Sequence, residues 1–156
     1  MHVTIVAVGQ KLPVWAQTAV DDYLARFPRD FTVSVKEVKA EPRTGGKPVA
    51  QVMAAEAERI AHAVAPGDIL VAMDEHGRDM TTVDFANKFC AWKNEGCNVT
   101  FVIGGADGLD PALKAKARMM LRLSSMTLPH AFARVLLAEQ IYRAWSILAN
   151  HPYHRA

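Results

Sequence analysis

Apolar residues in this chain recur with two spacings that alternate along its length. The segment His2–Gly9 is short, apolar and rich in β-branched residues, which is typical of a strand buried in a sheet. The apolar residues that follow are spaced as on a helix, and Pro13 suits the first turn of a helix reaching about Phe27. The same reasoning predicts further strands at residues 31–38, 69–74, 98–105 and 120–125. Further helices are predicted at residues 49–64, 83–95 and 130–150, with a short one opening at Asp110 and Pro111.

Turn-forming residues separate these elements. Lys39–Pro48 contains two prolines and two glycines and is predicted to be a loop, and residues 66–68 form a turn. Thr82 is a candidate N-cap for the helix that Gly96 ends. Alternation of strand and helix predicts an α/β fold, with a mainly parallel sheet covered by helices on both faces. No repeat, low-complexity tract or linker interrupts the pattern, so residues 1–156 are expected to form a single domain.

Composition adds a cellular setting to this fold. With 156 residues, 51% of them hydrophobic and 22% charged, the chain has the make-up of a soluble globular domain with a real core. No apolar run reaches the length of about 18 residues that a membrane span needs, and the N-terminus is predicted to be a strand and not a signal peptide. Cys90 and Cys97 lack metal-ligand spacing, so we expect reduced thiols in a cytoplasmic protein, with a disulfide or zinc site as the alternative.

Charge is distributed unevenly between the two parts of the chain. From Pro111 to Ala156 there are seven Lys and Arg residues against one acidic residue, Glu139, whereas residues 1–110 contain eleven basic and fifteen acidic residues. Such a split favours a surface that faces a polyanion, with nucleic acid as the usual candidate. The alternative is a solvated helix whose lysines keep the protein soluble.

The final helix is apolar over much of its circumference. Its stripe comprises Phe132, Val135, Leu136, Ile141, Trp145 and Leu148, widened by Leu137, Ala144 and Ile147. A helix of this kind must be covered on two sides, by its own sheet and by a second subunit or an overlying loop. We therefore expect a homodimer through this helix. Its remaining face carries Glu139 and Arg143, which form a favourable i,i+4 ion pair.

Two loops are candidates for ligand binding. Val102–Asp110 is glycine-rich and lies between a strand and a helix, where open α/β sheets bind ligands, but it matches neither dinucleotide nor ATP fingerprints. Gly104, Gly105 and Gly108 offer bare backbone to a flat heterocycle, although a tight turn explains them equally well. In Leu121–Ala131, hydroxyl groups alternate with apolar side chains, which suits an adenine and a thioether. The histidines are scattered and no G-x-S-x-G motif is present, so neither a metal site nor a hydrolase is expected.

Several motifs together closely resemble one enzyme family. VIGGADG, LSSMTLPH and the C-terminal RVLLAEQIYRAWSILANHPYHR resemble the RlmH (YbeA-type) branch of the SPOUT methyltransferases, and the N-terminal VAVGQKLPVWAQTAVDDYLARFPRDF is similar to the same family. The likeness extends over essentially the full length. It implies a homodimer with a C-terminal trefoil knot that methylates N3 of a pseudouridine in the helix 69 loop of 23S ribosomal RNA. S-adenosyl-L-methionine is the implied methyl donor, and the assembled ribosome is the expected substrate.

The resemblance also implies which residues form the site. The implied cofactor-binding residues are Met73, Gly104, Gly105, Leu123, Ser124, Ser125, Met126, Thr127 and Leu128. Removing the N3 proton calls for a base or cationic stabiliser, so we expect Tyr153, His154 and Arg155 to fold over the cofactor pocket as catalytic residues, with His154 handling the proton. Candidate RNA contacts are Lys11, Arg26, Arg134 and Arg143.

Two alternatives belong to other classes. A non-catalytic RNA- or ribosome-binding dimer would use the same basic segment without binding S-adenosylmethionine. A flavodoxin-like nucleotide-binding enzyme would need a phosphate loop, and the sequence does not contain one.

Overall fold

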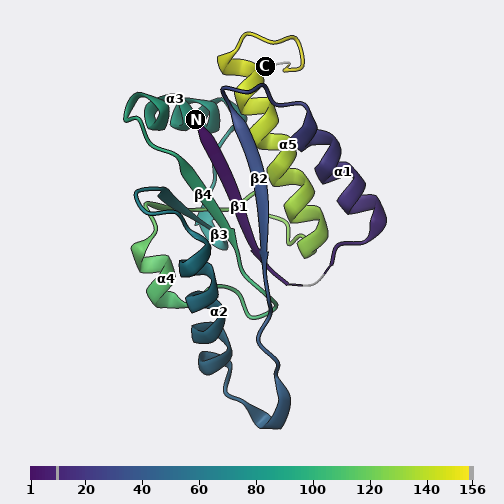
Figure 1. Ribbon diagram of the computed structural model, residues 1–156, viewed down its shortest axis with the longest axis vertical. Coiled ribbons are helices and arrows are strands. Elements are labelled where there is room, and N and C mark those ends of the chain that lie inside the picture. Colours follow the sequence, from purple (N-terminus) through teal and green to yellow (C-terminus); the bar gives the residue numbers. More distant parts are fainter. Residues whose placement is uncertain (10, 155–156) are drawn as a thin grey trace.

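A computed structural model describes residues 1–9 and 11–154 of the chain (Figure 1). Within these residues the strands form one five-stranded sheet in the order β2-β1-β4-β3-β5, and every neighbouring pair is parallel. The strands are β1 (His2–Val8), β2 (Thr32–Val38), β3 (Ile69–Arg78), β4 (Val99–Ile103) and β5 (Met119–Leu121). The helices are α1 (Val14–Ala25), α2 (Val49–Ala63), α3 (Thr82–Asn94), α4 (Pro111–Lys116) and α5 (His130–Leu148), with a 3₁₀ turn η1 at Thr44–Gly46. The predicted α/β class is confirmed, and the sheet is wholly parallel.

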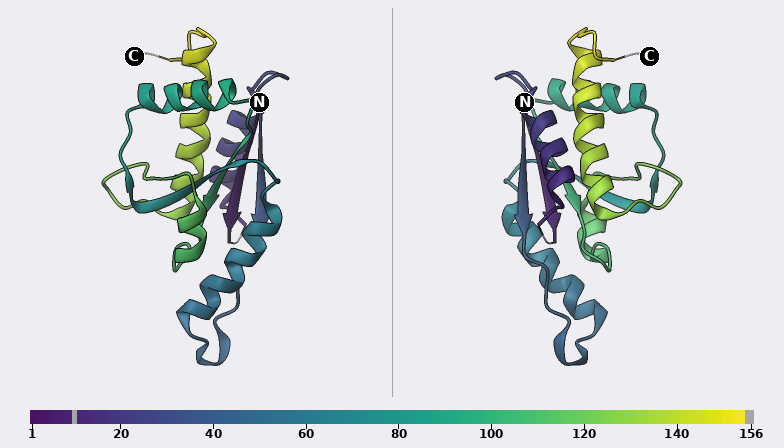
Figure 2. Two further views of the ribbon diagram at one scale, coloured as in Figure 1. Left: turned by 90° about the vertical axis from the view of Figure 1, so that its left-hand side faces the viewer. Right: turned by 90° about the vertical axis from the view of Figure 1, so that its right-hand side faces the viewer.

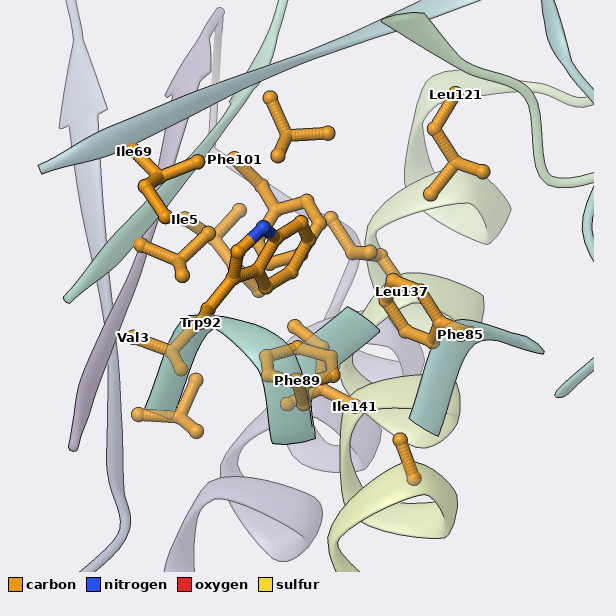
Figure 3. Close-up of a cluster of buried hydrophobic side chains, with 14 of the residues drawn as sticks. Val3, Ile5, Ile69, Phe85, Phe89, Trp92, Phe101, Leu121, Leu137 and Ile141 are labelled. Carbon is orange, nitrogen blue, oxygen red and sulfur yellow. The ribbon is translucent and has the colours of Figure 1, made fainter. Parts of the chain in front are cut away.

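The sheet has a separate core on each face. Side chains of a strand point alternately to opposite faces, so β1 contributes Val3 and Ile5 to one core and Val6 and Val8 to the other. The first core is the larger, and Figure 3 shows Phe85, Phe89 and Trp92 of α3 packed against Phe101 of β4 and against α5. The second core lies beneath α2 and α4. Each fully buried side chain of this size contributes about 1.5–3 kcal/mol to stability.

Helices α1 and α5 run side by side on the first face (Figures 1 and 2). Leu12, Ala16 and Val20 are buried between them, against Ala131 and Val135. The end of α5 therefore lies at the same end of the molecule as the N-terminus, far from the carboxyl ends of the strands (Figure 2). This direction of α5 decides where the C-terminal residues lie.

Some residues of the apolar stripe predicted on α5 do not face the sheet. The side turned to the sheet carries Leu137, Ile141 and Ala144, while Phe132 is 49% exposed and Leu136 is 36% exposed. Phe132 instead contacts Trp15 of α1, with the ring centroids 4.8 Å apart. The helix is apolar on two sides, as expected, and one of those sides faces solvent in the single chain. The homodimer stays a prediction.

Several boundaries differ from the sequence prediction: the third strand, for example, continues to Arg78 and the fourth ends at Ile103. The fifth strand ends at Leu121 and not at Ser125, because the Ser124 hydroxyl accepts the Met126 N–H at 2.9 Å and turns the chain. The N-cap of α3 is Thr81, which accepts from Asp84 N, and not Thr82. The C-terminal helix ends at Leu148, two residues before the expected Asn150.

Other expectations concern features outside the sheet. Asp110 caps α4 as predicted, accepting the Ala112 N–H at 2.8 Å. Cys90 and Cys97 are both free thiols. Among the described residues, none of the helices is long and apolar enough to cross a membrane. The trefoil knot implied by the resemblance stays a prediction.

Candidate functional site

A cavity of about 870 Å³ opens at the carboxyl ends of β1, β3, β4 and β5. Parallel strands bring their carboxyl ends to one edge of the sheet, and the loops that follow them diverge there to leave a crevice. The cavity is lined by residues that follow β1, β4 and β5, such as Gly9, Gly105 and Leu123, and by Asp74 in the second half of β3. Its size is typical of a pocket for a small molecule or cofactor.

The glycine loop after β4 needs its glycines for close packing. A Cβ on Gly104 would lie 2.7 Å from the backbone carbon of Gly108, a distance that real side chains do not tolerate. Gly108 also has a φ of +82°, and its N–H donates to the Gly105 carbonyl at 3.0 Å. Gly104 and Gly105 both line the cavity, so the tight turn also presents bare backbone to a ligand. The two interpretations of these glycines are therefore compatible.

The second loop, residues 122–129, forms the opposite wall. Leu123, Ser124, Met126, Thr127 and Leu128 line the cavity together with Met73, whereas Ser125 of the same loop does not. Arg122 holds the start of the loop with two hydrogen bonds of 2.6 Å to Asp79, just after β3. The implied cofactor residues therefore come together around one cavity, with Ser125 as the exception.

An ion pair that sequence reasoning missed borders the cavity. Asp74, at the end of the predicted strand 69–74, pairs with Lys114 of α4 at 3.0 Å and accepts the His76 N–H at 2.8 Å. Burial opposes ionisation of Asp74, but these two contacts outweigh it and hold the pKa of the carboxyl below its usual range. Position alone could have found Asp74, because polar residues at the carboxyl end of a parallel strand lie at the ligand edge.

Arg134 is not an RNA-facing residue in this structure, contrary to prediction. Its side chain is 1% exposed, and its guanidinium pairs with Glu37 of β2 at 3.2 Å and with Nε2 of His130 at 3.0 Å. A buried guanidinium with these partners presents no surface to a phosphate. His130 itself lines the cavity, and burial followed by the charge of Arg134 holds its pKa below the usual range.

The C-terminal tail does not lie over the cavity of its own chain, so the expectation that Tyr153, His154 and Arg155 fold over a cofactor pocket stays a prediction. The 19 residues of α5 begin at the cavity wall with His130 and carry the chain about 28 Å away at 1.5 Å per residue. Figures 1 and 2 show the tail at the other end of α5. Arg155 lies outside the described residues.

Tyr153 is held in place inside the tail. Its ring packs against Tyr142 with centroids 4.6 Å apart, and its hydroxyl donates to Glu139 at 3.1 Å and bonds the Tyr23 hydroxyl at 3.1 Å. Burial and these hydrogen bonds raise the pKa of Tyr153 above its ordinary value, so the phenol stays protonated. Within a single chain, Tyr153 anchors the tail to α1 and α5 through these contacts.

The remaining basic candidates occupy different places. Lys11 is exposed and lines the cavity, so its RNA contact stays a prediction. Arg26 is exposed on α1, paired with Asp22 at 2.9 Å and positioned 4.8 Å from the Tyr23 ring. The Arg143 pair with Glu139, at 2.7 Å, is confirmed, and it supports Tyr153 from the other side. Among residues 1–9 and 11–154, no group of three or more His, Cys, Asp and Glu side chains gathers to hold a metal ion.

Comparison with known proteins places the chain in a family. A family model described as a predicted SPOUT methyltransferase matches residues 1–154. Relatives from Bordetella pertussis and Burkholderia ambifaria, each named ribosomal RNA large subunit methyltransferase H, are 54% identical over 156 residues, which is 100% of this chain and of each relative.

Solved structures share the fold at lower identity. A probable methyltransferase from Bordetella pertussis Tohama I has a TM-score of 0.56 at 15% identity, covering 91% of this chain and 93% of that one. The SpoU methyltransferase AviRb from Streptomyces viridochromogenes has a TM-score of 0.50 at 16% identity, covering 96% and 61%. With a family model spanning nearly all residues and full-length relatives more than half identical, the chain belongs to the SPOUT methyltransferase family.

Proposed function

We propose that this protein transfers a methyl group from S-adenosyl-L-methionine to ribosomal RNA of the large subunit. The observation that carries the proposal is the cavity of about 870 Å³, formed by the loops that the family motifs single out. Full-length relatives at 54% identity are named as methyltransferases of that RNA, which supports the same conclusion.

The cavity has the chemistry that this cofactor needs. Met73, Ile103, Leu123 and Leu128 give apolar walls for an adenine, and the glycine loop gives backbone hydrogen-bonding groups for its edge. S-adenosylmethionine carries no phosphate, so a pocket without a phosphate-binding fingerprint is consistent with it. When bound, the cofactor supplies an electrophilic methyl group on a sulfonium. The chain's residues bind and orient it and keep water from it.

We further propose that the acceptor is N3 of a pseudouridine in the helix 69 loop of 23S ribosomal RNA, on assembled ribosomes in the cytoplasm. The resemblance of the C-terminal motifs supports this choice. N3 is a weakly acidic imide nitrogen, so a base that takes its proton speeds the attack. His154 is the candidate, because its Nδ1 has no hydrogen-bond partner within the part of the chain that the structure describes. Arg155 would stabilise the developing negative charge.

The distance between the tail and the cavity limits which cavity the tail can act on. The end of α5 lies about 28 Å from the cavity of the same chain, so a catalytic tail must act on the cavity of a second chain. The exposed apolar pair Trp15 and Phe132, with Leu136 on the same helix, offers a surface for that second chain. We therefore propose a homodimer in which each tail serves the partner.

The proposal is tested by incubating the purified protein with tritiated S-adenosylmethionine and ribosomes that lack the modification. Label in the large-subunit RNA is expected, together with cofactor binding by calorimetry. Binding to ribosomes without label, and without cofactor binding, would contradict the proposal and favour a non-catalytic RNA-binding dimer.

A further inference from the structure

A chain of polar contacts runs behind the cavity wall from the glycine loop to β2. His130, the first residue of α5, lines the cavity together with Gly104, whose backbone favours the charged form of the imidazole. Its Nε2 lies 3.0 Å from a terminal nitrogen of Arg134, one turn further along the helix. The other terminal nitrogen of Arg134 pairs with Glu37 at 3.2 Å.

These contacts determine where the imidazole carries its proton. Arginine has only donors, so Nε2 of His130 must accept the hydrogen bond from Arg134. A neutral imidazole that accepts at Nε2 carries its hydrogen on Nδ1. That hydrogen is the one available to the Gly104 backbone carbonyl. The structure therefore contains a directed chain from Arg134 through His130 to Gly104.

The glycine loop has no side chains of its own at residues 104, 105 and 108, so neighbouring side chains contribute to holding it in place. Only backbone contacts within the loop, such as the bond from the Gly108 N–H to the Gly105 carbonyl, and contacts from those neighbouring side chains can fix it. Arg134 is fully buried, and its Nε has no acceptor among the described residues, so its position depends on His130 and Glu37. A buried arginine held in this way is a rigid support for the imidazole.

We propose that His130 is a positioning residue, which Arg134 holds neutral and which orients the glycine loop so that the cavity can bind the methyl donor. The inference rests on the proposed function, because it concerns the affinity of the cavity for S-adenosylmethionine. His130 takes no part in the methyl transfer itself. Its contribution is the orientation of the Gly104 carbonyl.

The groups that face His130 make the arrangement sensitive to acid. Arg134 of α5 disfavours a charge on the ring, Glu37 of β2 favours it, and the exposed Lys11 lines the same cavity. Burial comes first among the causes that hold the pKa of His130 below 6.5. Protonation would remove the acceptor for Arg134 and set two cations side by side. Cofactor affinity should therefore be constant above about pH 6.5 and fall as the pH drops through the lowered pKa.

The test is the dissociation constant of S-adenosylmethionine, measured by calorimetry between about pH 5 and pH 7, a range below the titration of the cofactor's amino group. His130→Ala is expected to weaken binding about tenfold, or more, at pH 7. His130→Gln keeps an acceptor for Arg134 without a titratable ring, so it should restore most of the affinity and lose the acid dependence of the wild type. His62→Gln, at an exposed position on α2, is the matched control and should behave as the wild type.

Two further measurements keep the inference separate from folding and from the proposed function. Glu37→Gln removes the carboxylate that raises the pKa of His130, so it should move the midpoint of the acid dependence to lower pH even if His130→Ala fails to fold. Nitrogen-15 spectra of the imidazoles should show the hydrogen of His130 on Nδ1.

The outcomes are distinguishable. Wild-type protein that binds no cofactor would contradict the proposed function and the positioning role with it. Wild-type binding that His130→Ala leaves unchanged, an acid dependence that persists in His130→Gln, or a hydrogen found on Nε2 would overturn the inference alone.

Discussion

At the scale of single residues, the backbone of Gly104 and the ionised side chain of Asp74 shape the cavity most directly. Gly104 lets two segments of one loop approach within a distance that excludes any side chain. Asp74 ties β3 to α4 through Lys114. Both features place rigid polar groups at the cavity wall, and both can be tested by a single substitution.

Gly104 and Gly105, which both line the cavity, should differ in their tolerance of a methyl group. In Gly104→Ala the new Cβ would lie 2.7 Å from Gly108 backbone, so the loop must move, with a loss of about 1–3 kcal/mol in stability. In Gly105→Ala the nearest atom is a Glu56 carboxylate oxygen at 3.1 Å, which belongs to a side chain that can shift. Urea unfolding and cofactor calorimetry should both rank Gly104→Ala as the more damaging. The reverse order would contradict this account of the loop.

Asp74 should stabilise the protein only where it is ionised. Its pKa is lower in the folded protein than the value of about 3.9 in an unfolded chain, so its contribution is present above that value and is lost as the pH falls through the folded pKa. We expect Asp74→Asn to lower the free energy of unfolding by about 1 kcal/mol at pH 7. The difference in stability between the variant and the wild type should shrink as the pH falls through the lowered pKa of Asp74, as measured by urea unfolding.

Glu58→Gln, an exposed carboxylate on α2, is the control for Asp74→Asn and should change little at neutral or acid pH. An Asp74→Asn effect that stays the same at pH 7 and pH 2 would show that the loss does not come from the ionised pair.

Residue roles were the part of the site that the sequence predicted least well. Arg134 lies on a helix among apolar neighbours, and local pattern does not distinguish an exposed arginine from a buried one. Its partner Glu37 is almost a hundred positions away in the chain, so only the fold brings them together. The residues that the motifs single out for the cofactor do line one cavity, with the exception of Ser125, because a motif fixes them locally and strand order then gathers them.

At the scale of elements, the ends of helices and strands follow from short-range chemistry. The pattern of apolar residues predicted the helices and strands and the α/β class, because periodicity reports which side is buried. The same pattern predicted a fifth strand that is too long, because apolar and polar residues alternate in LRLSS as they do in a strand. In the structure the Ser124 hydroxyl accepts a backbone hydrogen bond and forms a turn there. The pattern also could not give the direction of α5, which depends on tertiary packing.

The end of α5 is a Schellman motif with asparagine in the place that glycine usually takes. The His151 N–H donates to the Ser146 carbonyl at 2.8 Å, the Asn150 N–H to the Ile147 carbonyl at 3.3 Å, and Asn150 has a φ of +53°. This turn sets the path of the tail away from the helix axis. The position of Tyr153 against Tyr142 follows from it.

Asn150→Ala should lower the free energy of unfolding by about 1 kcal/mol, because alanine is strained at a positive φ. Asn150→Gly should be neutral or slightly stabilising, since glycine adopts this conformation without strain. Thermal and urea unfolding of the two variants, compared with the wild type, measure the difference. If alanine is tolerated as well as glycine, the left-handed turn does not hold the tail.

At the scale of the whole molecule, the cavity and the tail lie at opposite ends of α5 (Figures 1 and 2). One chain therefore contains the complete cofactor cavity without the tail beside it. The sequence showed that α5 is apolar on two sides. It did not show that the tail and the cavity are far apart, because that distance depends on the direction of the helix in the folded chain. The proposed dimer follows from both observations.

Leu136→Glu should convert the proposed dimer into a monomer, because it places a charge on the exposed apolar side of α5. The monomer should still bind S-adenosylmethionine and should transfer no methyl group. Val83→Glu, at an exposed apolar position on α3, is the control and should leave the dimer intact. Light scattering gives the oligomeric state, and circular dichroism checks the fold. Methyl transfer by a monomeric protein would contradict a tail that acts on a second chain.

The most direct measurement compares the full chain with a chain truncated after Asn150, each incubated with tritiated S-adenosylmethionine and ribosomes lacking the modification. Nucleoside mass spectrometry of the 23S fragment that contains helix 69 then identifies the product. The account predicts methylated pseudouridine with the full chain, and no product from a truncated protein that remains a folded dimer and binds the cofactor. Near-normal turnover by the truncated chain, or label on another nucleotide, would contradict it.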